Sequence, residues 1–118
     1  MPNRRQQRRY DLALSAEIRA NEQLFTAITR NLSTGGCCIE SAYPCPEDGT
    51  VSVELFLVVD GIEDDSMPSM AVTAHVQWAA ESDEGPADAR HVAGLRFENA
   101  TAEQTEWLGR FLSKVQPE

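Results

Sequence analysis

The stretch RHVAGLRFENATAEQTEWLGRFLSKV, residues 90–115, decides the fold class because the spacing of its apolar residues changes midway. Over 90–97 apolar and other side chains alternate, which is typical of a half-buried strand. From Thr101 onward the apolar residues follow the stripe of an amphipathic helix, at Trp107, Leu108, Phe111, Leu112 and Val115. Thr101 followed by Gln104 is a capping-box signature. The stretch therefore predicts a last strand and then one helix over 101–116.

The residues upstream of this stretch show further strand signals. Alternating or short apolar runs between turn residues mark five segments, at 11–20, 24–30, 37–41, 50–59 and 70–79. A turn at 21–23 predicts that the first two strands form a hairpin. About six strands followed by one helix predict a small antiparallel barrel or sandwich, with the helix on one opening or face. The acidic segments 60–69 and 80–89 are expected to be loops.

The N-terminal arm, residues 1–10, carries four arginines and no acid in a chain whose net charge is −9, which leaves −13 on the rest. Such asymmetry predicts an anionic partner. The arginine fork binds phosphate through two hydrogen bonds and stacks on flat rings. A body of −13 would repel a long polyanion such as RNA or DNA but tolerate a small one. The sequence therefore favours a small anionic ligand over long nucleic acid.

Length and composition predict one domain over 1–118, with the arm at 1–10, the β-structure at 11–98 and the helix after it. No apolar run is long enough to span a bilayer and no secretory signal precedes the arginines, so we expect a cytoplasmic protein without membrane insertion. Cys37, Cys38 and Cys45 fit neither a disulfide framework nor a zinc spacing. No signature supports an enzyme that pairs Cys37 or Cys38 with a histidine, so we expect neither catalytic residues nor a metal.

The segment from Asn31 to Gly36, sequence NLSTGG, interrupts the strand pattern and has two interpretations. Its composition is typical of a turn between strands. Alternatively, Asn31 and Ser33 are two residues apart, so both side chains would emerge on one face of extended backbone. The glycines that follow would then leave room for a flat group, and the segment would form a polar cradle for a ligand.

Three signatures occur in one order along the chain: R-x-x-x-R at Arg5 and Arg9, (D/N)-x-S-x-x-G from Asn31 to Gly36, and VAGLRF at 92–97 ahead of the helix. Together these resemble the PilZ domain, the bacterial receptor module for cyclic di-GMP, over nearly the whole chain. The resemblance implies a mainly β fold, a six-stranded antiparallel β-barrel with a C-terminal α-helix. It also implies a binding module in bacterial signalling, with no enzymatic activity and no cofactor other than the ligand.

The resemblance implies a site for cyclic di-GMP divided between the arm and the second motif. Its expected residues are Arg4, Arg5, Arg9, Asn31, Ser33 and Gly36, with Arg8, Gly35 and Trp78 as secondary candidates. Arginine forks fit the O6/N7 edge of guanine and its phosphates. Arg4 and Arg8 also form R-x-x-x-R, one residue earlier than the preferred frame. The arm is expected to be mobile when empty, to become ordered on binding, and so to alter contact with a downstream protein partner.

Several alternatives remain open on sequence alone. The domain could instead act through protein contacts with little or no affinity for the nucleotide. Trp78 is in phase with Val72 and Val76, which favours the core or the barrel mouth, but it could also stack on a guanine. His75 is expected on the surface, and His91 partly buried. The acidic residues Asp64, Asp65, Asp83 and Glu84 are expected at loop tips, free either to attract the arm or to meet a partner.

Overall fold

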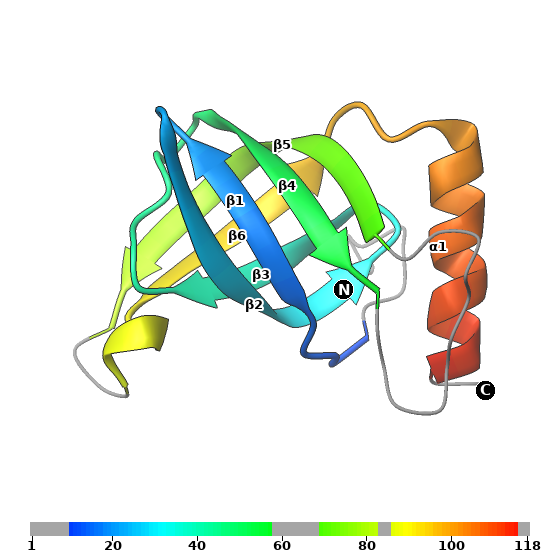
Figure 1. The fold of residues 1–118 in the computed structure, drawn as a ribbon, viewed down its shortest axis with the longest axis horizontal. Helices are drawn as coiled ribbons and strands as arrows, with labels where there is room; N and C mark the ends of the chain where they lie inside the picture. The colour runs from blue at the N-terminus through cyan, green and yellow to red at the C-terminus, as the bar shows by residue number, and fades with distance from the viewer. Residues whose placement is uncertain (1–9, 58–68, 83–85, 116–118) are drawn as a thin grey trace, which may run out of the picture.

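The computed structural model describes residues 10–57, 69–82 and 86–115 (Figure 1). Six antiparallel strands form one closed barrel in the order β1-β2-β3-β6-β5-β4, which confirms the predicted barrel and excludes the sandwich. The strands are β1 (Ser15–Ala20), β2 (Gln23–Ser33), β3 (Gly36–Ser41), β4 (Thr50–Phe56), β5 (Ser69–Glu81) and β6 (His91–Phe97). The 3₁₀ helix η1 (Ala87–Ala89) precedes β6, and the helix α1 (Ala102–Val115) follows it.

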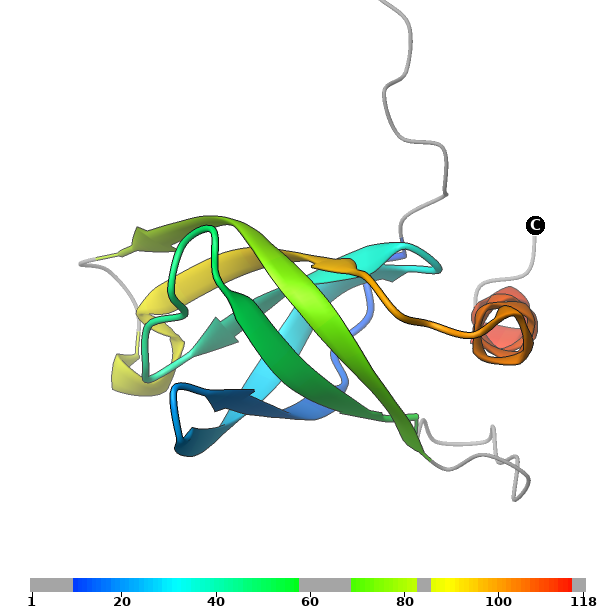
Figure 2. The ribbon, with the colours of Figure 1, turned by 90° about the horizontal axis from the view of Figure 1, so that it is seen from above.

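The core of the barrel is built from alternate side chains of each strand. On β4, for example, Val51, Val53 and Leu55 are buried while Ser52 is exposed, because successive side chains of a strand point to opposite faces. The apolar stripe of α1 belongs to the same buried cluster, through Trp107, Leu108, Phe111 and Leu112. Figures 1 and 2 place α1 beside the end of the barrel where β5 begins and β6 finishes.

The start of α1 carries the predicted capping box. The backbone N–H of Gln104 donates to Oγ1 of Thr101 at 3.0 Å, and the N–H of Thr101 donates to Oε1 of Gln104 at 2.9 Å. Nε2 of Gln104 also donates to the carbonyl of Ala71 on β5 at 3.2 Å. The same side chain therefore caps the helix and ties its first turn to the barrel.

The predicted first strand is shorter in the structure than in the sequence pattern. Residues 11–14 precede β1, although Leu14 is 1% exposed and packs in the core. Thr29 holds this segment, because its Oγ1 accepts a hydrogen bond from the N–H of Leu14 at 2.8 Å and donates one to the carbonyl of Leu12 at 2.5 Å. A side chain therefore replaces part of the backbone ladder that the alternation predicted.

The two strands that exceed their predicted lengths most are β2 and β5, and each contains a register shift. β2 continues through Ser33 and β5 through Glu81, so only Thr34 and Gly35 separate β2 from β3. The register shift in β2 lies between Thr29 and Asn31. The register shift in β5 lies between Val76 and Trp78. In each case two residues of the strand stand opposite one residue of the neighbouring strand, as at a β-bulge. Beyond the bulge, the side chains that point into the barrel are therefore those that would otherwise have pointed outward.

Some predictions fall outside the described residues. The end of the predicted strand 50–59 and the acidic tips at Asp64, Asp65, Asp83 and Glu84 lie there. The predicted loop over 80–89 is wrong at both of its ends, where β5 extends to Glu81 and η1 occupies 87–89.

The β1–β2 hairpin gives a stability prediction. Asn21 and Glu22 form its two-residue turn with φ of 50° and 70°, the left-handed values that a type I′ turn requires. Glutamate is strained in this region and glycine is not. We therefore expect Glu22→Gly to stabilise the fold by about 0.5–1 kcal/mol, as a higher urea midpoint. Glu22→Ala is the control: it also removes the carboxylate but should give no gain, and equal gains for both variants would contradict the backbone explanation.

Candidate functional site

The second sequence motif lies at the C-terminal end of β2 and in the turn after it. Leu32 is fully buried, at 0% exposed, between Asn31 and Ser33. Alternation therefore puts Asn31 and Ser33 on the face opposite the core, but Ser33 is buried and Asn31 is half-buried, so the polar cradle stays a prediction. The alternative interpretation of the whole segment as a turn is wrong for residues 31–33, which belong to the strand.

Ser33 and Gly36 have structural roles that the sequence did not show. Oγ of Ser33 accepts from the N–H of Gly35 at 3.2 Å and donates to the carbonyl of Gly36 at 3.3 Å, and Ser33 is only 3% exposed. A Cβ on Gly36 would lie 2.1 Å from the carbonyl oxygen of Leu95. Ser33 therefore holds the turn, and Gly36 permits close approach of β3 to β6.

The residue that follows the arginines is anchored to this motif. The N–H of Tyr10 donates to the carbonyl of Leu32 at 2.8 Å, and the N–H of Leu32 donates to the carbonyl of Tyr10 at 2.9 Å. Arg4, Arg5, Arg8 and Arg9 lie outside the described residues. Tyr10, the last residue of the arm, is the described residue that makes this contact. The arm therefore joins the barrel between the two polar side chains of the cradle.

A row of four side-chain positions crosses the outer face of the barrel beside the cradle. The register pairs Asn31 with Cys38, Cys38 with Gly94, and Gly94 with Trp78, so the row runs over β2, β3, β6 and β5. These residues line a hollow of about 140 Å³, together with Gln77. The hollow combines an amide, a small thiol and an indole within one row, which suits a flat polar ring.

Trp78 points outward, so the expectation that favoured the core is wrong. It is 44% exposed, whereas Val76 is fully buried. The register shift in β5 adds one residue between them and reverses the phase. The indole lies over Gly94, because a Cβ there would be 2.2 Å from Nε1 of Trp78. The alternative, a surface tryptophan available for stacking, fits the structure.

This packing makes a prediction for Gly94→Ala. The added methyl group cannot coexist with the present indole position, so we expect Trp78 to be displaced and more exposed. The expected readouts are a red-shifted tryptophan emission and stronger acrylamide quenching, in a domain destabilised by about 1–3 kcal/mol. Trp107 is 5% exposed and supplies the unchanged background. In a Trp78→Phe background Gly94→Ala should leave the emission unchanged, and a spectral change there would contradict the interpretation.

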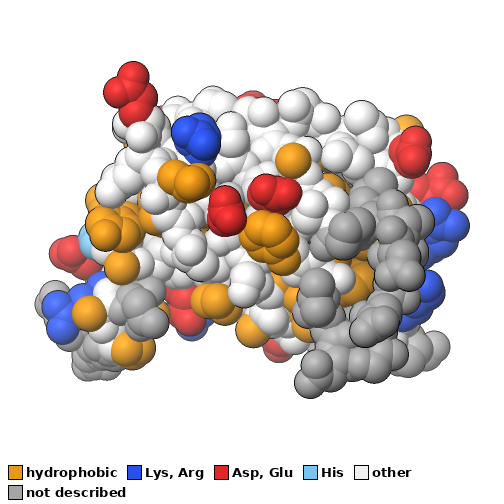
Figure 3. Space-filling view, in the orientation of Figure 1, with side chains coloured by type: hydrophobic (Ala, Val, Ile, Leu, Met, Phe, Trp, Pro, Cys, Tyr) orange, Lys and Arg blue, Asp and Glu red, His pale blue; other side chains and the backbone are white. Residues whose placement is uncertain are grey.

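Other parts of the surface are less suited to an anionic ligand. A hollow of about 320 Å³ on the β1–β4–β5 face is lined by Glu17 and Glu54, which face each other in register, and by one arginine, Arg19, so its lining carries net negative charge. Acidic and apolar side chains are interspersed on the β1, β2 and β4 face (Figure 3). Two opposed carboxylates repel phosphate. Arg96 lies on the same face of β6 as Gly94 and pairs in register with Gly36, so it is a cation next to the cradle. The sequence analysis did not name it as a candidate.

The histidines and cysteines fit structural positions. His75 lies 3.7 Å from Asp48, with its side chain 27% exposed, and His91 lies 3.5 Å from Glu81 at 21%, partly buried as predicted. The three cysteines are buried thiols outside any disulfide. Within residues 10–57, 69–82 and 86–115, no group of three or more potential ligand side chains is arranged for a metal. Among the same residues no helix is both long and apolar enough to cross a bilayer.

Comparison with known proteins identifies the family of this barrel. The PilZ domain model matches residues 3–114. The chain belongs to the PilZ domain family. The match includes the arm, the cradle and most of α1, so the PilZ assignment does not depend on one motif. No curated protein matches the sequence.

Solved structures agree with the PilZ fold at low sequence identity. The Bacillus subtilis inhibitor of motility (MotI/DgrA) is 17% identical, with a TM-score of 0.78 over 98% of this chain. The PilZ domain of Escherichia coli YcgR, solved with c-di-GMP, is 16% identical, with a TM-score of 0.73 over 97% of this chain and 92% of that one. The chain spans about half the length of the motility inhibitor, 52%.

Proposed function

We propose that this PilZ domain is a receptor for cyclic di-GMP that binds the nucleotide without catalysis. The observation that carries the proposal is the backbone bridge between Tyr10 and Leu32. It joins the arginine arm to the strand that carries Asn31 and Ser33. The two halves of the site implied by the motifs are thereby linked at one point of the barrel.

The proposed ligand contacts follow from the chemistry of each side chain. Arg4, Arg5 and Arg9 supply forks for the phosphates and for the O6/N7 edge of guanine, with Arg8 as a secondary contact. The amide of Asn31 both donates and accepts, as the polar edge of a base requires. Trp78 offers an exposed indole face at the other end of the row for stacking on a purine.

The motif glycines and serine act mainly through the backbone in this proposal. Ser33 keeps the turn in shape through its bonds to Gly35 and Gly36. Gly36 keeps β3 close to β6. Binding would order the arm over the cradle and so change the surface offered to a downstream protein partner. We expect the protein to work in the cytoplasm.

The solved neighbours support this choice of ligand. The structure of Escherichia coli YcgR contains c-di-GMP, and so does that of MrkH from K. pneumonia, which is 12% identical with a TM-score of 0.64. The net charge of −9 is a further argument, because it disfavours a long polyanion more than a compact dinucleotide.

Isothermal titration calorimetry with cyclic di-GMP, GTP and a short single-stranded RNA tests the proposal. We expect saturable binding of cyclic di-GMP alone. Asn31→Ala should weaken it by about 0.5–1.5 kcal/mol, the net value of a neutral hydrogen bond. Thr26→Ala, an exposed change on the same strand, should leave the affinity unchanged. Absence of cyclic di-GMP binding at tens of micromolar would overturn the proposal.

The second candidate is a PilZ-like protein-interaction module with little or no cyclic di-GMP affinity. One observation favours it: the hydroxyl of Ser33 is 3% exposed and already bonded within its turn. That motif residue therefore has a structural reason to be present without a ligand. The same titration separates the two candidates, because the second predicts no heat of binding with cyclic di-GMP, with GTP or with the RNA.

A further inference from the structure

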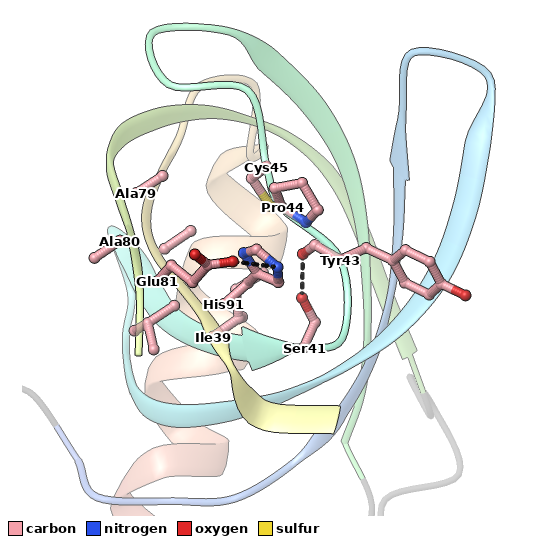
Figure 4. Close-up of a pocket in the computed structure, with 11 residues that line it drawn as sticks. Ile39, Ser41, Tyr43, Pro44, Cys45, Ala79, Ala80, Glu81 and His91 are labelled. Atoms are coloured by element: carbon pink, nitrogen blue, oxygen red, sulfur yellow. Dashed lines mark hydrogen bonds and ion pairs between the residues drawn. The ribbon is translucent and has the colours of Figure 1, made fainter. Parts of the chain in front are cut away.

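The end of the barrel opposite α1 opens into a cavity of about 290 Å³, here called the barrel mouth (Figure 4). It lies where β5 ends at Glu81 and β6 begins at His91, away from the helix-covered end. Its volume is at the lower end of the range for small-molecule pockets, about 300–1,000 Å³. The barrel mouth is therefore large enough for a compact ligand.

The floor of the barrel mouth is apolar. Ile39 and Ala93 belong to the buried core and line the cavity. Cys45 lies beside them, and desolvation by burial raises the pKa of its thiol from 9.0 to about 11. The thiol is therefore uncharged at neutral pH, and the floor offers contact to a short hydrocarbon stem rather than to a charge.

One wall of the cavity is polar. Glu81 and His91 face each other in register on β5 and β6, with Oε2 and Nε2 3.5 Å apart. Directly beyond them, the N–H of Ser82 donates to the carbonyl of Arg90 at 2.7 Å. Figure 4 shows the carboxylate and the imidazole pointing toward each other. The side chain of Glu81 is 65% exposed, so its carboxylate is accessible from the cavity.

The polar groups of the barrel mouth are mostly acceptors. The hydroxyl of Ser41 donates its proton to the carbonyl of Tyr43 at 2.7 Å, so its oxygen can offer a ligand only lone pairs. The ring of Tyr43 is turned away from the cavity in Figure 4 and packs 5.5 Å from Phe25, centroid to centroid. Among the described side chains that line the cavity, Glu81 is the one carboxylate, and Nε2 of His91 lies 3.5 Å from it, so a cationic hydrogen-bond donor would bind this carboxylate beside the imidazole.

We propose that the barrel mouth is a second binding site, for a small organic cation made of a primary ammonium group on a short apolar stem. The ammonium donates to Glu81, with Ser41 as a further acceptor, and the stem lies over Ile39 and Ala93. The net charge of −9 favours a cation at this end as well. The site differs from the cradle in position and in the sign of its ligand.

Titration of the ¹⁵N-labelled full chain with n-pentylammonium, followed by amide chemical shifts, tests this site. We expect saturable shifts at Ser41, Glu81, His91 and Ala93 and none at Asn31 or Trp78. Pentanol and pentanoate carry the same stem without the positive charge, so we expect weaker binding of the alcohol and none of the acid. Equal affinity for the amine and the alcohol, or no saturable shift at the mouth, would overturn the proposal.

Two variants of the barrel mouth and one control variant make the test specific. Glu81→Gln should weaken the binding of n-pentylammonium by about two- to fivefold, as expected when an ion pair is lost at a carboxylate whose side chain is 65% exposed. Glu103→Gln removes the same charge from an exposed position on α1 and should change nothing. Ala79→Leu narrows the cavity from its side and should abolish binding of both amine and alcohol. Unchanged amine binding in either mouth variant, with a native amide spectrum, would overturn the assignment.

Discussion

The double variant Arg5→Ala/Arg9→Ala is expected to lose cyclic di-GMP binding by more than a hundredfold. Each arginine makes charge-assisted contacts worth about 1.5–3 kcal/mol, and the effects should add where they reach different groups of the ligand. Together they amount to about 3–6 kcal/mol, and every 1.4 kcal/mol is tenfold in Kd. Isothermal titration calorimetry at fixed salt measures the loss, since both arginines precede the barrel and should leave its stability unchanged.

A matched control separates specific contact from loss of charge. Arg19→Ala/Arg90→Ala removes two exposed arginines from the end of β1 and from the turn before β6, with the same change in net charge. We expect its affinity to fall by less than about threefold, as for distant screened charges. If both double variants lost affinity equally, general attraction of an anion would explain the arm, and its motif would have no special role.

The register of the arginine motif is tested by a second pair. Arg4 and Arg8 have the same spacing as Arg5 and Arg9, one residue earlier. The backbone bridge of Tyr10 to Leu32 makes Arg9 the arginine nearest to the cradle along the chain. We therefore expect Arg4→Ala/Arg8→Ala to cost less than the Arg5/Arg9 pair. If Arg4→Ala/Arg8→Ala lost more affinity than Arg5→Ala/Arg9→Ala, the binding motif would consist of Arg4 and Arg8 instead.

The sequence predicted the architecture because, in most of the chain, the spacing of apolar residues matches the strand or helix that the structure contains. The β4 alternation, the helical stripe and the Thr101–Gln104 capping box all depend on neighbours within four residues. Such local patterns are visible without knowing the tertiary structure. The barrel itself, rather than a sandwich, required the resemblance to a family, because closure depends on which edge strands pair.

The site was harder to predict because two register shifts lie beside it. The shift in β5 turns Trp78 from the expected inward phase to the surface, and the shift in β2 sets the face of Asn31. Strict alternation carries no sign of an inserted residue. Gly94 was the available signal, since a glycine inside a strand often marks close approach of another group. Here that group is the indole of Trp78.

Leu108→Ala is expected to destabilise the domain by about 2–5 kcal/mol, the usual cost of such a truncation in a packed core. Leu108 is 0% exposed and lies in the cluster that contains the barrel interior. The helix around it has a second tie to the barrel, from Gln104 to the carbonyl of Ala71. We therefore expect α1 and the barrel to unfold together, with a lower urea midpoint and an unchanged m-value.

Two signals decide whether this cooperativity holds. Far-ultraviolet circular dichroism near 222 nm reports mainly α1, and the emission of Trp78 in a Trp107→Phe background reports the barrel. Arg110→Ala, an exposed change on the same helix, should alter the stability by less than about 0.5 kcal/mol. If Leu108→Ala lost the helical signal while the barrel signal kept its midpoint, α1 would be an accessory element. Coincident transitions would instead mean that α1 and the barrel share one core. The helix also lies against the Thr34 turn, because a Cβ on Gly109 would be 3.7 Å from Cγ2 of Thr34.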